Sequence, residues 1–325
     1  MGGIPPQRAG TKEEISVRPL HESDLPVADQ IMRLAFGTFL GFPEPTSFMG
    51  DASYVRTRWR AEPTAAFGAQ VGGELVGSNF ATNWGTVGFF GPLTIRPDLW
   101  DRGIGKRLME PIMNCFARWG TAHAGLFTFA HSQKHVGLYQ KFGFWPRFLT
   151  AIMSKPVQRV ASRSQWSLFS EVPESEREAS LRACAELTDA VYEGLDVGRE
   201  IRAVSAQNLG DTGLLWDGTR LVGLAVCHCG PGTEAGSGTC YVKFAAARPS
   251  PTAERNFDRL LDACEEMAAE KGLSRLAAGV NMARHEAYGR MLERGFRTDF
   301  QGVAMQRPNE PGYNQPGVYV MDDWR

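Results

Sequence analysis

The sequence predicts an α/β fold, in which helices cover a mixed sheet and the whole layer occurs twice along the chain. Short apolar segments of strand character alternate with amphipathic segments of helical spacing through most of the 325 residues. The second half also repeats residues of the first at one constant offset. A chain of this length accommodates two such units.

The first copy begins with the alternating strand "ISVRP", followed by Ser23, Asp24 and a helix. The stretch "AAFGAQVGGELVGSNFATNW" is typical of a hairpin around a Gly-Gly turn. A strand ending in "LTIRP" follows, then a helix to Trp119, the buried strand "AGLFTFA", the helix "SQKHVGLYQKFGF" and the strand "WPRFLTAIMSKPV". The order β-α-β-β-β-α-β-α-β predicts a mixed sheet.

The second copy follows a polar, helix-like stretch from about residue 158 to residue 212. The pattern then resumes with the hairpin "LLWDGTRLVGLAV", the strand "CYVKFAAARP" and the helix "AERNFDRLLDACEEMAAEKG". After them come "LSRLAAGV", a helix to Gly295 and "FQGVAMQRP". We therefore expect one domain at residues 1–157 and a second at residues 158–325.

The repeat has an offset of 152 residues without a gap, and its matches fall at corresponding strand and helix ends. The matching pairs are Arg96-Pro97 with Arg248-Pro249, Arg107-Leu108 with Arg259-Leu260, Gly120 with Gly272, Gly143-Phe144 with Gly295-Phe296, Phe148 with Phe300, Met153 with Met305, and Pro156 with Pro308. The identity is low, but the shared offset indicates two copies of one fold.

Composition excludes several functions. With 35 basic and 36 acidic residues, the chain has no net positive field to hold nucleic acid or an anionic membrane. No apolar run is long enough to cross a bilayer, and the start "MGGIPPQRAG" lacks the apolar core of a secretory signal. The six cysteines are sparse and form no C-x-x-C pairs, so we expect a reduced, cytoplasmic protein.

The segment "VCHCG" at residues 226–230 raises the alternative of a metal cluster together with Cys240. In a strand, Cys227 and Cys229 point to one face and His228 to the other. Because this separates the ligands, we expect buried, apolar cysteines and no metal site.

The segment "DLWDRGIGKRLMEP", residues 98–111, sets Gly103 and Gly105 between a strand and a helix. A helix start offers unpaired N–H groups and a partial positive charge, and glycine allows an anion close approach. Arg102, Lys106 and Arg107 add charge at the rim. The pattern predicts a pyrophosphate site, although a glycine pair is also typical of a plain turn. It is neither GxxxxGK[ST] nor GxGxxG.

In context, "LTIRP", "WDRGIGKRLM", a strand and "VGLYQKFGF" resemble the GNAT acetyltransferase superfamily over about residues 15–157. Residues 160–325 resemble it by architecture alone. That family carries a [QR]-x-x-G-x-[GA] loop for the acyl-CoA pyrophosphate, matched here by residues 100–105 (the glycine loop), with Trp100 replacing Gln or Arg. The resemblance implies a tandem GNAT protein with acetyl-CoA held by Arg102, Gly103, Ile104, Gly105, Lys106 and Arg107.

The resemblance also implies that the strand before the loop splays from its neighbour and pairs with the pantetheine arm. Leu93, Thr94 and Ile95 match that strand. Tyr139, in "LYQKFGF", matches the general acid that protonates the departing thiolate, since a phenol with a pKa of about 10 is neutral. The alternative is a core tyrosine on an amphipathic helix.

The general base is less well defined, because the strand "GFFGPLTI" carries no carboxylate. The candidates are Glu44, Asp51, His123, His131 and His135. We expect His131, which follows the strand "AGLFTFA", while a plain surface histidine remains the alternative. An acceptor pocket is expected at the first helix and its loop, lined by Phe36, Phe39, Phe42, Phe48 and Trp59, with Glu44 or Asp51 attracting the amine.

The second copy differs where chemistry is expected. At the offset of 152, Arg255 replaces Gly103, Phe257 replaces Gly105 and Met291 replaces Tyr139. We therefore expect an acyl-CoA-dependent N-acyltransferase, most simply N-acetyl, with acetyl-CoA in the first copy and a small-molecule or peptide amine as acceptor. The second copy would shape the acceptor site or form a homo-oligomer contact.

Two alternatives stay open. The first is an acyl-CoA-binding sensor without turnover, which needs the glycine loop but not Tyr139. The second places the activity in the second copy through "VNMARHEAY", which requires abandoning the uniform offset for Asn281 and Tyr288.

Overall fold

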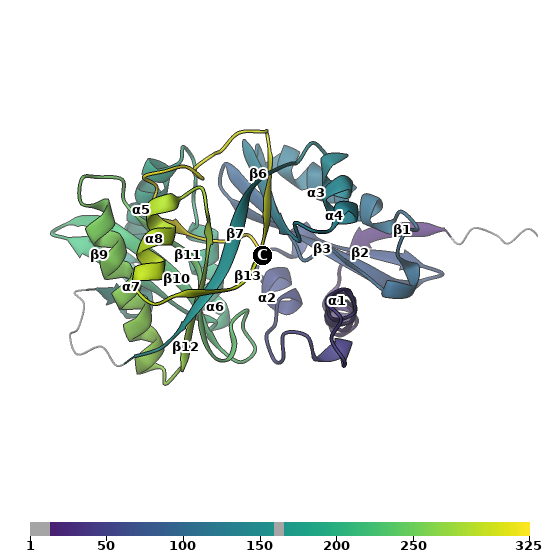
Figure 1. The fold of residues 1–325 in the computed structure, drawn as a ribbon, viewed down its shortest axis with the longest axis horizontal. Coiled ribbons are helices and arrows are strands. Elements are labelled where there is room, and N and C mark those ends of the chain that lie inside the picture. Colours follow the sequence, from purple (N-terminus) through teal and green to yellow (C-terminus); the bar gives the residue numbers. More distant parts are fainter. Residues whose placement is uncertain (1–13, 159–165) are drawn as a thin grey trace, which may run out of the picture.

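The computed structural model describes residues 14–158 and 166–325. Our expectations for the start of the chain and for the link between the two copies fall partly on residues 1–13 and 159–165, outside the described residues. In the described part the predicted α/β class is confirmed: a 14-stranded mixed sheet carries helices on both faces (Figure 1). None of the described helices is long and apolar enough to span a membrane.

The strands are β1 (Ile15–Pro19), β2 (Ala66–Val71), β3 (Glu74–Trp84), β4 (Val87–Phe90), β5 (Thr94–Ile95), β6 (His123–Thr128), β7 (Trp145–Pro156), β8 (Ser167–Leu168), β9 (Gly210–Asp217), β10 (Arg220–Gly230), β11 (Gly236–Ala247), β12 (Arg275–Asn281), β13 (Arg297–Arg307) and β14 (Val320–Met321). The helices are α1 (Leu25–Phe39), α2 (Val55–Ala61), α3 (Ile104–Trp119), α4 (Gln133–Gln140), α5 (Glu174–Val191), α6 (Gly198–Gln207), α7 (Ala253–Glu270) and α8 (His285–Glu293). We call residues 14–158 the first half and residues 166–325 the second half.

The predicted elements of both halves are present, with two differences in the first. Sequence reasoning missed the short helix α2 in the loop after α1. It also read one strand where the structure has two, since β4 ends at Phe90 and β5 starts at Thr94. Pro92 lies in this break, and proline has no N–H to continue the ladder.

The centre of the sheet is formed by an exchange of strands between the halves. The strand order is β1-β2-β3-β4-β6-β13-β7-β12-β11-β10-β9-β8. β13 of the second half thus lies between β6 and β7 of the first, while β7 pairs with β12 of the second half. In Figure 1 the teal β7 and the yellow-green β13 run side by side between the two halves.

The exchange obeys the repeat found in the sequence. Ser154 pairs with Arg297, and Trp145 pairs with Gln306. At the offset of 152, Ser154 corresponds to Gln306 and Trp145 to Arg297, so the two pairs are equivalent. The flanking pairs obey the same rule, because Thr128–Val303 on one side corresponds to Val280–Ala151 on the other. The two copies are therefore related by a pseudo-twofold axis between β7 and β13.

Each half also contributes side chains to the hydrophobic core of the other. Val303 and Met305 of β13 are buried with α3 and α4 residues of the first half, such as Met109 and Tyr139. Ala151 and Met153 of β7 are buried with α7 and α8 residues of the second half. Burial of apolar surface is the main stabilising term, so neither core is complete in the isolated half.

A buried ionic cluster joins the halves on one face of the sheet. Arg58 of α2 donates from Nε and Nη2 to both carboxylate oxygens of Glu234, and Lys243 of β11 donates to the same carboxylate at 2.6 Å. All three side chains are at most 4 % exposed. Burial alone would raise the pKa of Glu234, but Arg58 and Lys243 outweigh it and hold the pKa below its ordinary value.

We predict that neither half folds alone. Residues 1–158 expressed by themselves lack β13, which leaves the edges of β6 and β7 unpaired and the core without Val303 and Met305. Residues 159–325 lack β7. The two fragments should be insoluble or molten separately and should copurify as a folded heterodimer when coexpressed, as judged by near-UV circular dichroism. A cooperative, native-like spectrum from residues 1–158 alone would contradict the exchange.

We also predict that Glu234→Ala destabilises the protein by about 3–5 kcal/mol, because it leaves two buried cations without their partner. The matched control is Glu178→Ala, whose exposed pair with Arg202 should contribute less than about 1 kcal/mol. Urea unfolding measures both.

The pH dependence of this difference has a definite sign. Because the pKa of Glu234 is lower when folded, its contribution is present above the ordinary value of 4.5 and is lost as the pH falls below it. The difference in free energy of unfolding between the wild type and Glu234→Ala should therefore become smaller as the pH falls. A gap that widens in acid would contradict the assignment.

Candidate active site

The glycine loop forms the start of α3. Gly103 is the N-cap of this helix, has a φ of 80°, and no side chain of the described residues caps the first turn. A Cβ at Gly103 would meet no atom within 4 Å. The space beside Gly103 at the helix start is therefore open, and the left-handed backbone at Gly103 suits glycine.

The residues around Gly103 brace the turn. The Nε1 of Trp100 donates to the carbonyl oxygen of Ile95 at 2.8 Å, which ties the loop to the end of β5. Asp101, with a φ of 66°, pairs with Lys134 of α4 at 2.6 Å. Trp100 thus has a structural role in place of the Gln or Arg of the family pattern. Arg102, Lys106 and Arg107 are exposed beside the helix start.

Gly105 has a different environment from Gly103. It is buried, and a Cβ there would lie 3.2 Å from Leu138 Cδ2 and 3.3 Å from Ile95 Cδ1. Leu93 is also within 4 Å of that position. Gly105 therefore lets α3 approach both β5 and α4, so that the glycine loop, the strand before it and the helix of Tyr139 meet at one point.

The strands diverge at this point. β4 pairs with β6 in parallel only as far as Phe89 with Gly125. β5 then pairs with β3, through Thr94 with Ser78 and Ile95 with Gly77. The N–H of Arg96 donates to Val76 on the β3 side, so by alternation the N–H of Ile95 faces the β6 side. Within the described residues, no strand pairs with β5 on that side.

Tyr139 lies beneath this divergence. Its side chain extends from α4 into the core of the first half, where its ring is 5.6 Å from that of Phe90. Burial raises the pKa of the phenol above its ordinary value, while hydrogen bonding with Thr128 at the end of β6 opposes this weakly. The group is therefore a neutral phenol, able to donate a proton but not to act as a base at neutral pH.

The other side of the divergence is shaped by Arg58, which sequence reasoning missed. Its Nη1 donates to the carbonyl oxygen of Gly91 at 2.6 Å, directly after β4. Its Nη2 also donates to the carbonyl oxygen of Arg325. Because Glu234 holds Arg58, the second half fixes the backbone just before β5. No local signal identifies the pair, since 176 residues separate them.

The predicted acceptor aromatics are brought together in part. Phe36 and Phe48 stack at 5.4 Å, and Phe42 meets Phe48 edge-on at 5.6 Å. Phe129, which follows β6, joins them through Phe36 and Phe39 at 6.2 and 4.9 Å. Trp59 packs against the same core cluster as Phe36 and Phe48, and its Nε1 donates to the carbonyl oxygen of Leu20 at 3.0 Å.

The candidate bases are scattered. His131 is exposed and stacks on Phe39 at 5.8 Å, and His135 packs against the same ring. His123 lies at the first residue of β6, away from the divergence, and burial lowers its pKa to about 4. Asp51 is bound to the backbone and hydroxyl of Ser237, and Glu44 is exposed. Of the five candidate bases, His131 and His135 are the two whose rings contact a predicted acceptor aromatic, Phe39.

The cysteine strand has the predicted geometry. Cys227 packs in the core under α7, as does Cys229 at its edge, whereas His228 points to the opposite face toward Glu200. Among the described residues, no group of three or more His, Cys, Asp and Glu is arranged to hold a metal ion.

Comparison with known proteins bears on the first half and on the overall fold. Residues 29–144 match the model of the Acetyltransferase (GNAT) family. No curated protein matches significantly. The fold is similar to a putative acetyltransferase from Pyrococcus horikoshii, with a TM-score of 0.67, 14 % identity and 99 % of each chain covered.

Two further solved structures have a related fold. A GCN5-related N-acetyltransferase from Sphaerobacter thermophilus gives a TM-score of 0.58 at 15 % identity, covering 92 % of this chain and 96 % of that one. A tandem GNAT protein from the clavulanic acid biosynthesis pathway gives 0.52 at 12 % identity, covering 90 % and 98 %. Residues 29–144 are thus matched by the GNAT acetyltransferase family, and the fold of the whole chain is similar to that of a tandem GNAT protein.

Proposed function

We propose that the protein transfers an acyl group, most simply acetyl, from acyl-CoA to a primary amine of a small molecule or peptide. The observation that carries the proposal is the uncapped start of α3 at Gly103, next to the strand edge of β5 and the buried phenol of Tyr139. Binding and cleaving an acyl-CoA thioester requires an anion-binding site, a free strand edge and a proton donor.

The glycine loop fits a pyrophosphate. Gly103 leaves the helix N–H groups accessible, and Arg102, Lys106 and Arg107 add positive charge beside them. The pantetheine arm would then run along Leu93, Thr94 and Ile95, where the N–H of Ile95 faces the divergence. An N–H on this edge would also polarise the thioester carbonyl.

The transfer is a direct attack in a ternary complex. The amine nitrogen forms a bond to the thioester carbon, and the carbon–sulfur bond breaks as the tetrahedral adduct collapses. Tyr139 gives its proton to the departing thiolate, and the amine proton passes to a base. His131 remains our proposal for that base, because it lies beside the aromatic side chains of the expected acceptor region.

The second half would act on the acceptor side without binding cofactor. Glu234, which also accepts from Lys243, holds Arg58, and Arg58 donates to the carbonyl oxygen of Gly91. Trp324 packs on Gly125, the last residue of β6 that pairs with β4. The second half would thus form part of the wall against which the amine is placed.

Gly103→Ala should weaken acetyl-CoA binding at least tenfold, because a Cβ would occupy the space expected for a phosphate oxygen. The control is Gly120→Ala at the other end of α3, which also has positive φ and no atom near its Cβ. Both variants carry a similar backbone strain of about 1–2 kcal/mol. Calorimetric titration should give unchanged affinity for Gly120→Ala, and equal losses in both variants would refute the loop assignment.

Tyr139→Phe should lower kcat for CoA release about a hundredfold or more while leaving the acetyl-CoA Kd within about threefold. The readout is thiol release with a panel of polyamines, aromatic amines and peptides. Because burial raises the pKa of Tyr139, the wild-type rate should show no alkaline limb from this group below pH 10.

The control for this prediction is Tyr288→Phe on α8, which also tests the reading that places chemistry in the second half. Full activity in Tyr139→Phe would remove this residue from the mechanism. Tight acetyl-CoA binding by the wild type with no thiol release for any amine would favour the sensor alternative.

A further inference from the structure

The second half contains the same strand divergence as the first. β11 pairs with β12 in parallel from Thr239 with Arg275 to Val242 with Ala278, and β11 then continues to Ala247 without β12. At the offset of 152, Thr239 and Arg275 correspond to Val87 and His123, where β4 begins to pair with β6. Ala245, Ala246 and Ala247 therefore correspond to Leu93, Thr94 and Ile95.

This second divergence is filled by the chain itself. β14 pairs antiparallel with β11, Ala245 with Met321 and Ala246 with Val320. Because β10 covers the other edge of these same residues, β14 must lie on the β12 side. The N–H of Ala247 donates to the carbonyl oxygen of Tyr319 at 3.0 Å, whereas the corresponding N–H of Ile95 faces the divergence in the first half.

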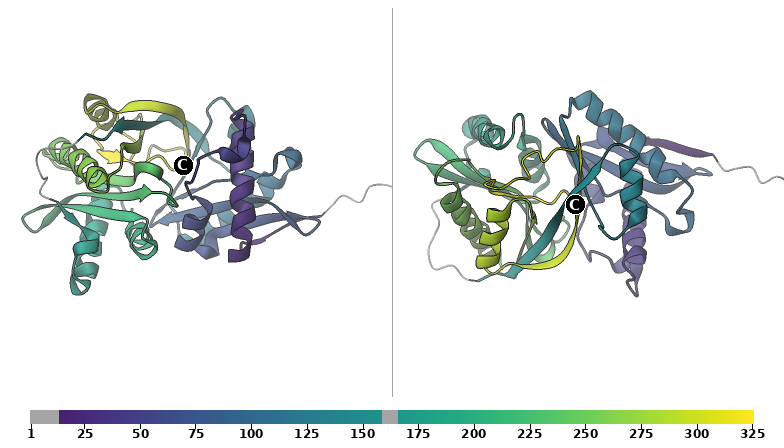
Figure 2. Two further views of the ribbon diagram at one scale, coloured as in Figure 1. Left: turned by 90° about the horizontal axis from the view of Figure 1, so that it is seen from below. Right: turned by 45° about the horizontal axis from the view of Figure 1, so that its top comes forward.

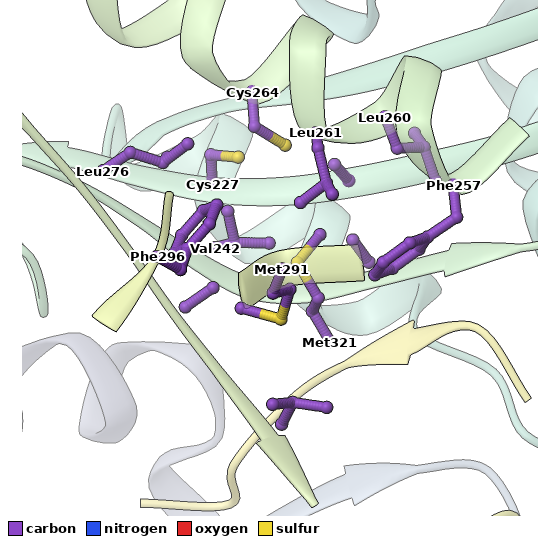
Figure 3. Close-up of a cluster of buried hydrophobic side chains, with 14 of the residues drawn as sticks. Cys227, Val242, Phe257, Leu260, Leu261, Cys264, Leu276, Met291, Phe296 and Met321 are labelled. Atoms are coloured by element: carbon purple, nitrogen blue, oxygen red, sulfur yellow. The ribbon is translucent and has the colours of Figure 1, made fainter. Parts of the chain in front are cut away.

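The side chains of this segment meet the two residues that replace the first-half site. Tyr319 packs on Phe257, the counterpart of Gly105, at 5.5 Å between ring centroids. Met321 is fully buried in one cluster with Phe257 and Met291, the counterpart of Tyr139 (Figure 3). In the second half, one packed apolar core thus takes the place of the glycine loop, the proton donor and the free strand edge of the first half.

The filling segment is anchored on both sides. Before β14, the N–H of Gly317 donates to Glu286 at 2.7 Å, and the hydroxyl of Tyr319 lies 3.4 Å from Glu254. After β14, Asp322 pairs with the buried Arg284 at 2.7 Å. Figure 2 shows the yellow segment continuing between the halves. Val320 and Met321 are fully buried, so the segment belongs to the core of the second half.

We infer that residues 319–321 are an internal replacement for the pantetheine arm in the second half, so that each chain has one acyl-CoA site. The inference rests on the proposed function for the identity of the cofactor. The occupancy of the second divergence by β14 does not depend on it.

The test is amide hydrogen exchange on the full chain at residue resolution, with and without saturating acetyl-CoA, together with calorimetric stoichiometry. In the free chain, the amide of Ala247 should exchange at least a hundredfold more slowly than that of Ile95. Acetyl-CoA should slow Ile95 and leave Ala247 unchanged, at one equivalent per chain. Fast exchange of Ala247 in the free chain, its further protection by acetyl-CoA, or a second bound equivalent would overturn the inference.

A matched pair of variants tests the segment directly. Tyr319→Ser removes the ring from Phe257 and should accelerate exchange of Ala247 at least tenfold. Tyr288→Ser removes a ring that borders the same core without pairing with β14 and should leave that amide unchanged. Equal effects in both variants would overturn the role of Tyr319. If acetyl-CoA neither binds nor protects any amide, the proposed function fails, while slow exchange of Ala247 still supports the internal strand.

Discussion

The antiparallel pairing of β7 with β13 is the constraint on which the rest of the structure depends. It places the closing strand of each copy beside the other copy, so one sheet runs through both halves. Because β6 has β13 as its neighbour, the strands that diverge around Leu93 and Ile95 are supported on one side by the second half. The candidate active-site region of the first half is therefore assembled only in the complete chain.

A second consequence follows from where α2 lies. Arg58 has to reach Glu234 in the other half, because a buried cation without a partner would be strongly destabilising. The same guanidinium holds the carbonyl of Gly91 at the entrance to β5. The electrostatic link between the halves and the geometry of the expected cofactor strand thus share one side chain.

Local features of the fold could be predicted from the sequence, and long-range ones could not. The glycine loop, the order of elements and the offset of 152 depend on short-range patterns such as Gly103 before an amphipathic helix. The strand exchange is a choice of partner for β7 and β13, which have the same apolar character and would also suit pairing within their own copy. Arg58 and Trp324 make contacts between the two halves, and β14 pairs with β11 far from it in the sequence, as Met321 does with Ala245. None of these contacts leaves a periodic pattern in the sequence. Among the candidate site residues, Gly103, Gly105 and Tyr139 could be proposed from the sequence because they lie in two recognisable motifs, whereas no motif points to the base.

The strand exchange also bears on how the chain is made. A polypeptide emerges from the ribosome beginning with its N-terminal residues, so β6 is available long before β13. At synthesis rates of about 5–20 residues per second, the interval between residues 128 and 307 lasts roughly ten to forty seconds. Through that interval the edge of β6 is an unpaired, apolar template for other nascent chains. The strand exchange that unites the two copies in the finished molecule therefore leaves the first half incomplete during translation. Until β13 is made, the first half depends on chaperones to cover the exposed edge of β6, or on its own slow folding.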